Sequence, residues 1–429
     1  MTYQGRWDRR TALRAMAALA GVATAAPLLG EPATAQASPG GDADALFKAG
    51  HFEQAGHAYE EILKKDPGNV HAARRRGYVG LLSNNFPDAE KYLKTAIALA
   101  PGDREAHRFL ADCYTRQDKF ALAAPHWQGA DYQAYATLFA AFRGQPYEIH
   151  GDTGRAPFRQ LDPIPQVEAS LNGGPLKRFS FYTRVDSLGV SAKAAEEAGL
   201  RAVAKEKVEY LGKTFWFYYG ILDSFALGGI ELRNIPVRWS DGDSGEQSDD
   251  GMIGTWILYH FLTTIDYAGR SLILRRRTPE TARKARAEAE RAGAQPLPLW
   301  LAQEHLLFSR GSVAGSPGVV AVNLGGTGEA VAAMPQETAK RLRVRVDEDR
   351  PMETAAGGQA VTVYPCYPKE VRLGNAVARD AYCYAGAPSG PGREGFEQLA
   401  HLSHSFYKPF HVTLDFTGMS IHVARGPAS

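Results

Sequence analysis

Three side chains near the C-terminus have types and spacing that could bind a metal ion. Glu397, His401 and His404 are separated by four and then three residues, which is the spacing of one helical face. Carboxylate and imidazole groups are common zinc ligands. His404, however, falls where a turn is predicted, so the three side chains would not share a face. We therefore expect no metal site here.

Other patterns that carry chemistry are scarce. The chain has no phosphate-binding glycine loop, no nucleophile elbow and no four-cysteine metal site, and we expect no cofactor. Cys113, Cys366 and Cys383 are too few for a disulfide framework. Cys366 and Cys383 could pair in an oxidising compartment, or both could be buried free thiols.

The composition is that of a folded chain with two or three domains. It has 429 residues, of which 44% are hydrophobic, and this excludes a mainly disordered, collagen-like or multi-span membrane protein. Forty-nine Lys and Arg against 47 Asp and Glu give a net charge of +2. Residues 1–37 contain four Arg and two acidic residues, so the remainder is neutral. A neutral chain lacks the basic surface that nucleic acid requires, and we expect no nucleic-acid partner.

Residues 1–37 have the pattern of an export signal. Arg9-Arg10 is followed by an uncharged stretch from Ala15 to Gly30 and then by small-x-small patterns between Ala33 and Ala37. The uncharged stretch is shorter than the roughly 20 residues that a membrane-spanning helix needs. The paired arginines resemble a twin-arginine signal. We expect a periplasmic or secreted protein with no integral membrane segment after signal removal.

A 34-residue period runs through the next segment. It relates the triplets at 50–52, 84–86 and 118–120, each of which ends in Phe, and it relates Pro67 to Pro101. A strict period of this length is typical of stacked helical hairpins. The segment resembles tetratricopeptide repeats over residues 42–135, with a truncated first hairpin. Such arrays usually bind a peptide or partner protein on their concave face. The alternative is a spacer or a dimerisation arm.

From residue 160 onward the hydrophobic pattern shifts towards that of β-strands. Asn172-Gly173, between two alternating stretches, predicts a hairpin. Residues 227–235 are matched by 373–381, and 261–267 by 410–416, at nearly constant offset. Matches in one order at one offset indicate two copies of a β-rich lobe. We place the lobes at residues 160–277 and 300–425, joined by a linker helix within 278–299.

This arrangement resembles the retropepsin-like and pepsin-like aspartic peptidases of the secreted bacterial kind, which are often fused to tetratricopeptide repeats. The parts that carry the resemblance are the Asn172-Gly173 hairpin, Ile253-Gly254, and the closing strands around Ile265-Asp266-Tyr267 and Leu414-Asp415-Phe416. The resemblance implies two β-lobes, each contributing an Asp-Thr-Gly turn after its second strand. The two aspartates would share one proton and activate a water molecule.

At both positions where the resemblance requires a catalytic Asp, this chain has another residue. The first lobe has Tyr182 and the second has Asn323. Asparagine has no titrating proton, and the tyrosine hydroxyl, with a pKa of about 10, is a poor base at neutral pH. We therefore expect no peptidase activity. The residues expected to line a peptide-binding cleft are Thr183, Arg184, Gly325, Gly326 and Thr327.

Four carboxylates elsewhere could restore the chemistry if the register were different. Asp152 begins an Asp-Thr-Gly string, but the segment before it, Pro146–Gly151, is a poor strand, and a loop is the better interpretation. Asp186 could swing into the cleft, although a solvated position beside the turn is favoured. Asp266 and Asp415 occupy equivalent places, where a hydrogen bond to a neighbouring turn is the simpler role.

The sequence thus predicts an α+β multidomain protein, with a helical repeat array followed by two acid-protease-like β-lobes. The favoured function is binding of a peptide or partner protein by an exported protein whose aspartic-peptidase-like domain has lost its catalytic residues. The alternative is an active aspartic endopeptidase that uses a carboxylate outside the expected register. A purely structural role in the cell envelope is a third, less specific possibility.

Overall fold

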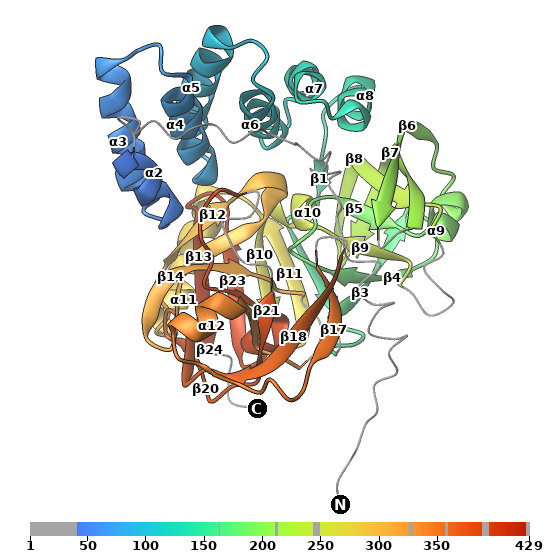
Figure 1. Cartoon of the computed structure of the whole chain (residues 1–429). Helices are drawn as coiled ribbons and strands as arrows, with labels where there is room; N and C mark the ends of the chain where they lie inside the picture. Colours follow the sequence, from blue (N-terminus) through green and yellow to red (C-terminus); the bar gives the residue numbers. More distant parts are fainter. Residues whose placement is uncertain are drawn as a thin grey trace, which may run out of the picture.

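The computed structural model describes residues 41–162, 164–210, 213–242, 249–325, 329–356, 359–387 and 394–425. The export signal expected in residues 1–37 lies outside these ranges. A helical N-terminal region packs on one side of a larger β-rich region, so the chain is α+β (Figure 1). Within the described ranges, no helix combines the length and the apolar character needed to cross a membrane.

The helical region consists of antiparallel hairpins. Its helices are α2 (Gly41–Lys48), α3 (Phe52–Lys65), α4 (Val70–Leu82), α5 (Phe86–Leu99), α6 (Arg104–Thr115), α7 (Phe120–Gly129) and α8 (Gln133–Ala141). Side chains of Asn69, Asn85 and Asp103 cap α4, α5 and α6 by accepting backbone N–H groups of the first turn. A Cβ at Gly80 would lie 2.9 Å from the backbone nitrogen of Ala89, so α4 and α5 are in close backbone contact.

The β-rich region has two parts of similar topology. We call residues 148–276 the first β-half and residues 297–425 the second β-half. In chain order, the first contains β1 (Glu148–His150), β2 (Thr153–Pro157), β3 (Gln166–Leu171), β4 (Lys177–Phe181), β5 (Leu188–Val190), α9 (Ala192–Glu197), β6 (Ala202–Tyr210), β7 (Lys213–Leu227), β8 (Ile230–Ser240), β9 (Gly251–Ile253), α10 (Thr255–Tyr259), β10 (Phe261–Asp266) and β11 (Ser271–Arg276).

Helix α11 (Pro279–Arg291) joins the two halves, within the linker predicted at 278–299. The second half contains β12 (Leu297–Leu301), the 3₁₀ helix η1 (Gln303–His305), β13 (Leu307–Val313), β14 (Ser316–Val322), β15 (Ala332–Pro335), α12 (Gln336–Arg341), β16 (Arg345–Val346), β17 (Met352–Ala356), β18 (Gln359–Tyr367), β19 (Glu370–Leu373), β20 (Ala376–Arg379), β21 (Cys383–Ala387), β22 (Ala400–Leu402), α13 (His404–Tyr407), β23 (Phe410–Asp415) and β24 (Ser420–Arg425).

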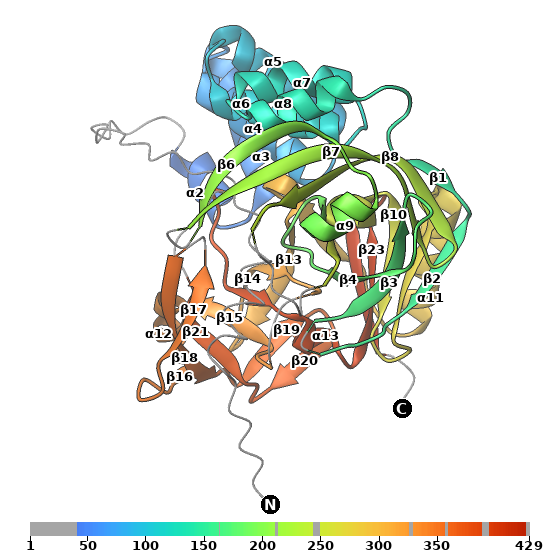
Figure 2. The same ribbon diagram turned by 90° about the vertical axis from the view of Figure 1, so that its right-hand side faces the viewer.

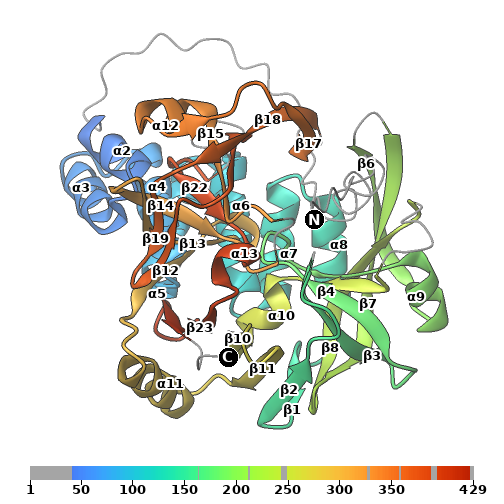
Figure 3. The same cartoon turned by 90° about the horizontal axis from the view of Figure 1, so that it is seen from below.

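The same strand pairings occur in both halves, in the same order. The antiparallel pair β3–β4 corresponds to β13–β14, and the parallel pair β4–β9 corresponds to β14–β22. Antiparallel β5–β9 and parallel β5–β8 correspond to β15–β22 and β15–β21. A short helix follows β5 and β15, and another follows β9 and β22. Seen from below, the halves lie on opposite sides of α10 and α13 (Figure 3).

A central sheet connects the two halves. Its strand order is β2-β11-β10-β23-β24-β12, so that strands of the first half are continuous with strands of the second. The pair β10–β23 at its centre is antiparallel and joins the segments that the sequence identified as copies of each other. The two halves therefore share one hydrogen-bonded sheet, and their relative position is fixed by backbone hydrogen bonds.

One local prediction is wrong. Pro146–Gly151 was expected to be a poor strand, yet Glu148–His150 forms β1 and pairs with residues 231–233 of β8. Asp152 and Gly151 then form the turn into β2. The strand is only three residues long and lies at the edge of its sheet, so few local pattern positions could have indicated it.

The helical array is docked on the β-rich region through helices α4, α6 and α8 and through Phe52 at the start of α3. Helices α4, α6 and α8 contact β12, η1 and the β6–β7 hairpin, respectively. Figure 2 shows α8 lying over β7. Phe52 packs edge-on against Trp300 and Phe396, with ring centroids 4.8 and 4.9 Å apart. The buried guanidinium of Arg116 donates to the carbonyls of Leu301 and Ala302 at 3.2 and 3.0 Å. The array and the β-rich region therefore form one packed body.

Candidate functional site

Two turns from opposite halves meet at the centre of the molecule. We call Tyr182–Arg184, which follows β4, the first turn, and Asn323–Gly325, which follows β14, the second turn. The hydroxyl of Thr183 donates to the carbonyl of Val322 at 2.9 Å and accepts the backbone N–H of Leu324 at 3.0 Å. Thr183 is completely buried. One hydroxyl thus connects the first turn to both sides of Asn323.

The glycine of the second turn is required by the closeness of this contact. A Cβ at Gly325 would lie 1.8 Å from the carbonyl oxygen of Phe181 and 2.9 Å from Cα of Tyr182. Any larger residue would push the turns apart. The hydroxyl of Tyr267, directly after β10, donates to the carbonyl of Leu324 and so holds the second turn.

Tyr182 and Asn323 occupy the starts of the two turns. The backbone N–H of Tyr182 donates to Ile253 at 3.1 Å, and that of Asn323 donates to Leu402 at 2.9 Å. These are equivalent bonds, because Ile253 ends β9 and Leu402 ends β22. The side chain of Asn323 is nine-tenths buried, and its Oδ1 has no hydrogen-bond partner among the described residues. Gly326 and Thr327, which were expected to line a cleft, lie outside the described residues.

Arg184 makes a second contact between the halves. Its guanidinium donates to Nδ1 of His401 on β22 at 2.5 Å. Burial and the positive charge of Arg184 lower the pKa of His401 well below its usual value, so the ring is neutral at pH 7 and can accept this hydrogen bond. Within the described part of the chain, Arg184 forms no ion pair with a carboxylate.

Asp152, the first carboxylate considered as an alternative catalytic residue, lies away from the two turns. Its side chain is 91% exposed and forms a surface ion pair with Arg276 at 2.9 Å, at the edge strand of the central sheet. The backbone carbonyl of Asp152 also accepts the N–H of Arg276. Asp152 is therefore not part of the contact between the two turns.

Asp186 is not solvated, contrary to expectation. Only 4% of it is exposed, and its carboxylate accepts the hydroxyl of Tyr135 at 2.7 Å and the N–H of Ser187 at 2.6 Å. Arg238 lies 3.7 Å away. Tyr135 belongs to α8, so this carboxylate contributes to docking of the helical array.

Asp266 and Asp415 have the structural role that was expected. Asp266 accepts the N–H of Gly269 at 2.6 Å, and Asp415 accepts the N–H groups of Thr417 and Gly418 at 2.9 and 3.0 Å. Each carboxylate thus closes the turn that follows its own strand.

The three side chains with metal-like spacing are separated. Glu397 pairs with Lys48 at 3.4 Å, and His404 lies 3.2 Å from Asp162. His401 contacts Arg184 instead. The described residues contain no cluster of three or more His, Cys, Asp or Glu that could hold a metal ion. All three cysteines are buried free thiols, although Cys366 and Cys383 lie opposite each other on β18 and β21.

Sequence reasoning missed His401 and Tyr267 as parts of this site. His401 was noted only for its spacing from Glu397 and His404, and its partner Arg184 is 217 residues away in the chain. Tyr267 follows β10 and was named only as part of the closing segment that carries the resemblance, with no role for its hydroxyl. The equivalence of β9 and β22 could have indicated that β22 lies beside the second turn.

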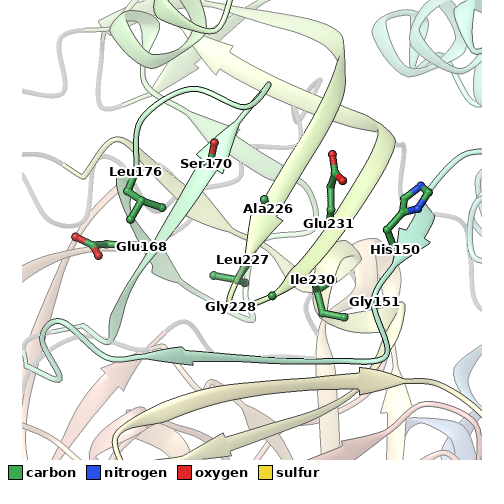
Figure 4. Close-up of a pocket in the computed structure, with 11 residues that line it drawn as sticks. His150, Gly151, Glu168, Ser170, Leu176, Ala226, Leu227, Gly228, Ile230 and Glu231 are labelled. Atoms are coloured by element: carbon green, nitrogen blue, oxygen red, sulfur yellow. The ribbon is translucent and has the colours of Figure 1, made fainter.

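A separate surface pocket lies in the first β-half (Figure 4). Its volume is about 480 Å³, and its lining includes His150, Glu168, Leu176 and Glu231 around the β7–β8 turn. Glu168 and Glu231 are already paired with Arg159 and Arg233. The pocket has no residue in common with the two turns.

Comparison with known proteins identifies the helical array. Residues 42–103 and 81–137 match the family profile described as Tetratricopeptide repeat. The prediction of such repeats in the N-terminal region is confirmed, and repeats of this family indicate binding of protein partners. None of the curated proteins compared matches this chain.

Proposed function

We propose that this protein is an exported binding protein, in which an aspartic-peptidase-like β-region has lost hydrolytic activity and binds a peptide or partner protein. The contact between the two turns carries the proposal. In the fold that the sequence resembles, the first residues of these turns are the catalytic aspartates. Here they are Tyr182 and Asn323, and neither turn contains Asp or Glu.

The repeated strand pairings support the peptidase-like fold. Each half has the hairpin, the parallel pair and the short helix in the same order, and each ends its second strand at the contact. Two halves of this topology, joined by one sheet, match what the resemblance implies. The Thr183 hydroxyl, bonded to Val322 and Leu324, gives the contact a defined geometry.

The chemistry of the two turns supports binding without hydrolysis. Positioned general bases contribute about 10²- to 10⁴-fold to reaction rates, and neither of the two turns has a carboxylate to act as one. Peptide binding does not need that group, because an extended peptide can pair with strand edges through backbone hydrogen bonds.

Docking of the helical array reduces the surface that is available to a partner. Helices α4, α6 and α8 are already in contact with the β-rich region, so the face that usually binds peptides is at least partly covered. The second helices of the hairpins, α5 and α7, carry exposed Leu99 and Leu122. A partner would meet either this outer side or the region between the two β-halves.

Two measurements test the proposal. Fractionation of cells that express the whole chain should place it outside the cytoplasm, with an N-terminus near Ser38 by mass spectrometry. The purified mature protein, immobilised and exposed to a digest of unfolded protein, should retain peptides that elute intact. A cytoplasmic chain with residues 1–37 intact contradicts export, and a failure to retain any peptide or protein contradicts the binding role.

A further inference from the structure

The guanidinium of Arg184 has no anionic partner among the residues that the structure describes. The residue is half-buried, and its hydrogen bond to the neutral ring of His401 leaves the positive charge uncompensated. Two other partly buried arginines, Arg76 and Arg238, are paired with carboxylates, whereas Arg277 donates to the carbonyls of Tyr259 and Phe416. An unpaired charge removed from water is costly, so Arg184 is suited to receive an anion.

The second unusual group is the side-chain amide of Asn323. Its Oδ1 is a buried acceptor with no donor among the described residues. Buried polar atoms in folded proteins are normally paired, and one that is not requires an explanation such as a bound water, ion or ligand group. This atom could accept the N–H of a peptide bond.

These two groups belong to the same place in the fold. Arg184 contacts His401, and the next residue, Leu402, accepts the backbone N–H of Asn323. Thr183, which precedes Arg184, is bonded to both neighbours of Asn323. A charged donor from the first half and a free acceptor from the second half therefore flank one contact.

We propose that Arg184 binds a carboxylate of a bound peptide, while Oδ1 of Asn323 accepts a backbone N–H of that peptide. This rests on the proposed peptide-binding function and adds the chemistry by which the peptide is selected. His401 is a positioning residue, because its neutral Nδ1 orients the guanidinium without cancelling its charge. A pair of catalytic aspartates would repel such a peptide, whereas Arg184 attracts it.

The carboxylate could come from the C-terminus of the peptide or from an Asp or Glu side chain, and the experiment separates these sources. The probe is a pool of N-acetylated hexapeptides of random sequence lacking Asp and Glu, prepared once as free acids and once as C-terminal amides. A third pool of amides contains Glu at one position. Each pool is passed over the immobilised mature protein at pH 7, and retention is quantified by mass spectrometry.

The wild-type protein should retain a carboxylate-bearing pool at least tenfold more than the neutral amide pool. If the free acids are retained, the site recognises the C-terminal carboxylate of the peptide. If only the Glu-containing amides are retained, it recognises an acidic side chain. The Arg184→Gln variant should lose this preference, while Arg178→Gln, which removes an exposed arginine from β4, should keep it. The isosteric Asn323→Asp variant should also lose it, because its carboxylate would compete for Arg184.

Arg184→Lys provides a variant that keeps the charge, and its preference should be weakened but present. Equal retention of all three pools by the wild-type protein would overturn the carboxylate site while leaving peptide binding intact. A preference that survives in Arg184→Gln would overturn the role of Arg184. Retention of none of the pools would contradict the proposed function, and with it this inference.

Discussion

Thr264 on β10 and Thr413 on β23 lie directly opposite each other on adjacent antiparallel strands, with hydroxyl oxygens 2.9 Å apart. They are 149 residues apart, the same offset that relates Phe261 to Phe410 at the starts of the two strands. The two copies of this segment therefore pair with each other about a local two-fold axis between the threonines. This pairing fixes the halves so that the ends of β4 and β14 meet.

The hydroxyl of Thr183 should be important for the stability of the contact between the turns. Thr183→Val keeps the shape but leaves Val322 O and Leu324 N–H buried without this partner. We expect a loss of about 3 kcal/mol in the free energy of unfolding, measured by urea denaturation. Thr183→Ser keeps the hydroxyl and should lose only about 1 kcal/mol. Equal stability of the two variants would show that the hydrogen bonds are unimportant.

The docked array should depend on the buried ion pair between Arg116 and Asp112, whose atoms are 2.6 Å apart. Arg116→Met leaves that carboxylate buried without its charge partner and removes the bonds to Leu301 and Ala302. We expect a loss of about 3–5 kcal/mol in the free energy of unfolding.

The matched control for this prediction is the exposed pair between Arg104 and Asp131, at 3.5 Å. Arg104→Met should change the free energy of unfolding by less than about 1 kcal/mol, because surface ion pairs contribute little. Similar losses in Arg104→Met and Arg116→Met would contradict the assigned role of the buried pair.

Stability should fall as the pH is lowered from 7. Burial lowers the pKa of His305, despite the opposing effect of Asp112, so the folded protein keeps this ring neutral while the unfolded chain takes up a proton below about pH 6.5. His401 has the same sign of shift. Burial tends to raise the pKa of Asp112, but Arg116 outweighs it and holds the pKa at about 2. The contribution of Asp112 is therefore complete above about pH 4 and is lost as the pH falls towards 2.

The contribution of His305 can be isolated by His305→Asn. Asparagine tolerates the left-handed backbone at this position, where φ is 60°. Urea midpoints measured from pH 8 to 5 should fall less steeply with decreasing pH in this variant than in the wild-type protein. An unchanged slope would mean that His305 does not titrate as its burial requires.

Asp152 should have little influence on stability. Its carboxylate is 91% exposed and pairs with Arg276 at the surface. Asp152→Asn should change the free energy of unfolding by less than about 1 kcal/mol, and thermal unfolding measures this directly. A loss above about 2 kcal/mol would show that the carboxylate has a role that its surface position does not explain.

The sequence correctly predicted those elements whose conformation is determined by residues close together in the chain. Asn172-Gly173 predicts a tight hairpin because both residues tolerate positive φ, and their φ values are 49° and 69°. The 34-residue period predicts stacked hairpins because each repeat buries the face of its neighbour. Of the two pairs of matched segments, 261–267 and 410–416 contain β10 and β23, which pair with each other.

Features that depend on distant partners were not predictable from local patterns. Asp186 looks like a solvated turn residue, and its burial results from Tyr135, which lies 51 residues earlier in a helix. The role of His401 depends on Arg184 in the other half. Docking of the array on the β-rich region likewise depends on residues such as Trp300 and Phe396, whose contacts with Phe52 no periodicity reveals.

The central claim of the proposed function is that the contact between the two turns hydrolyses no peptide, and a cleavage assay tests this most directly. The mature protein is incubated with unfolded protein substrates from pH 3 to 8, with and without pepstatin, beside Asp152→Asn, and the products are identified by mass spectrometry. The account predicts no new cleavage products at any pH. Pepstatin-sensitive cleavage in the wild-type protein would contradict it. If Asp152→Asn abolished that cleavage, the catalytic carboxylate would be Asp152 and not a residue of the two turns.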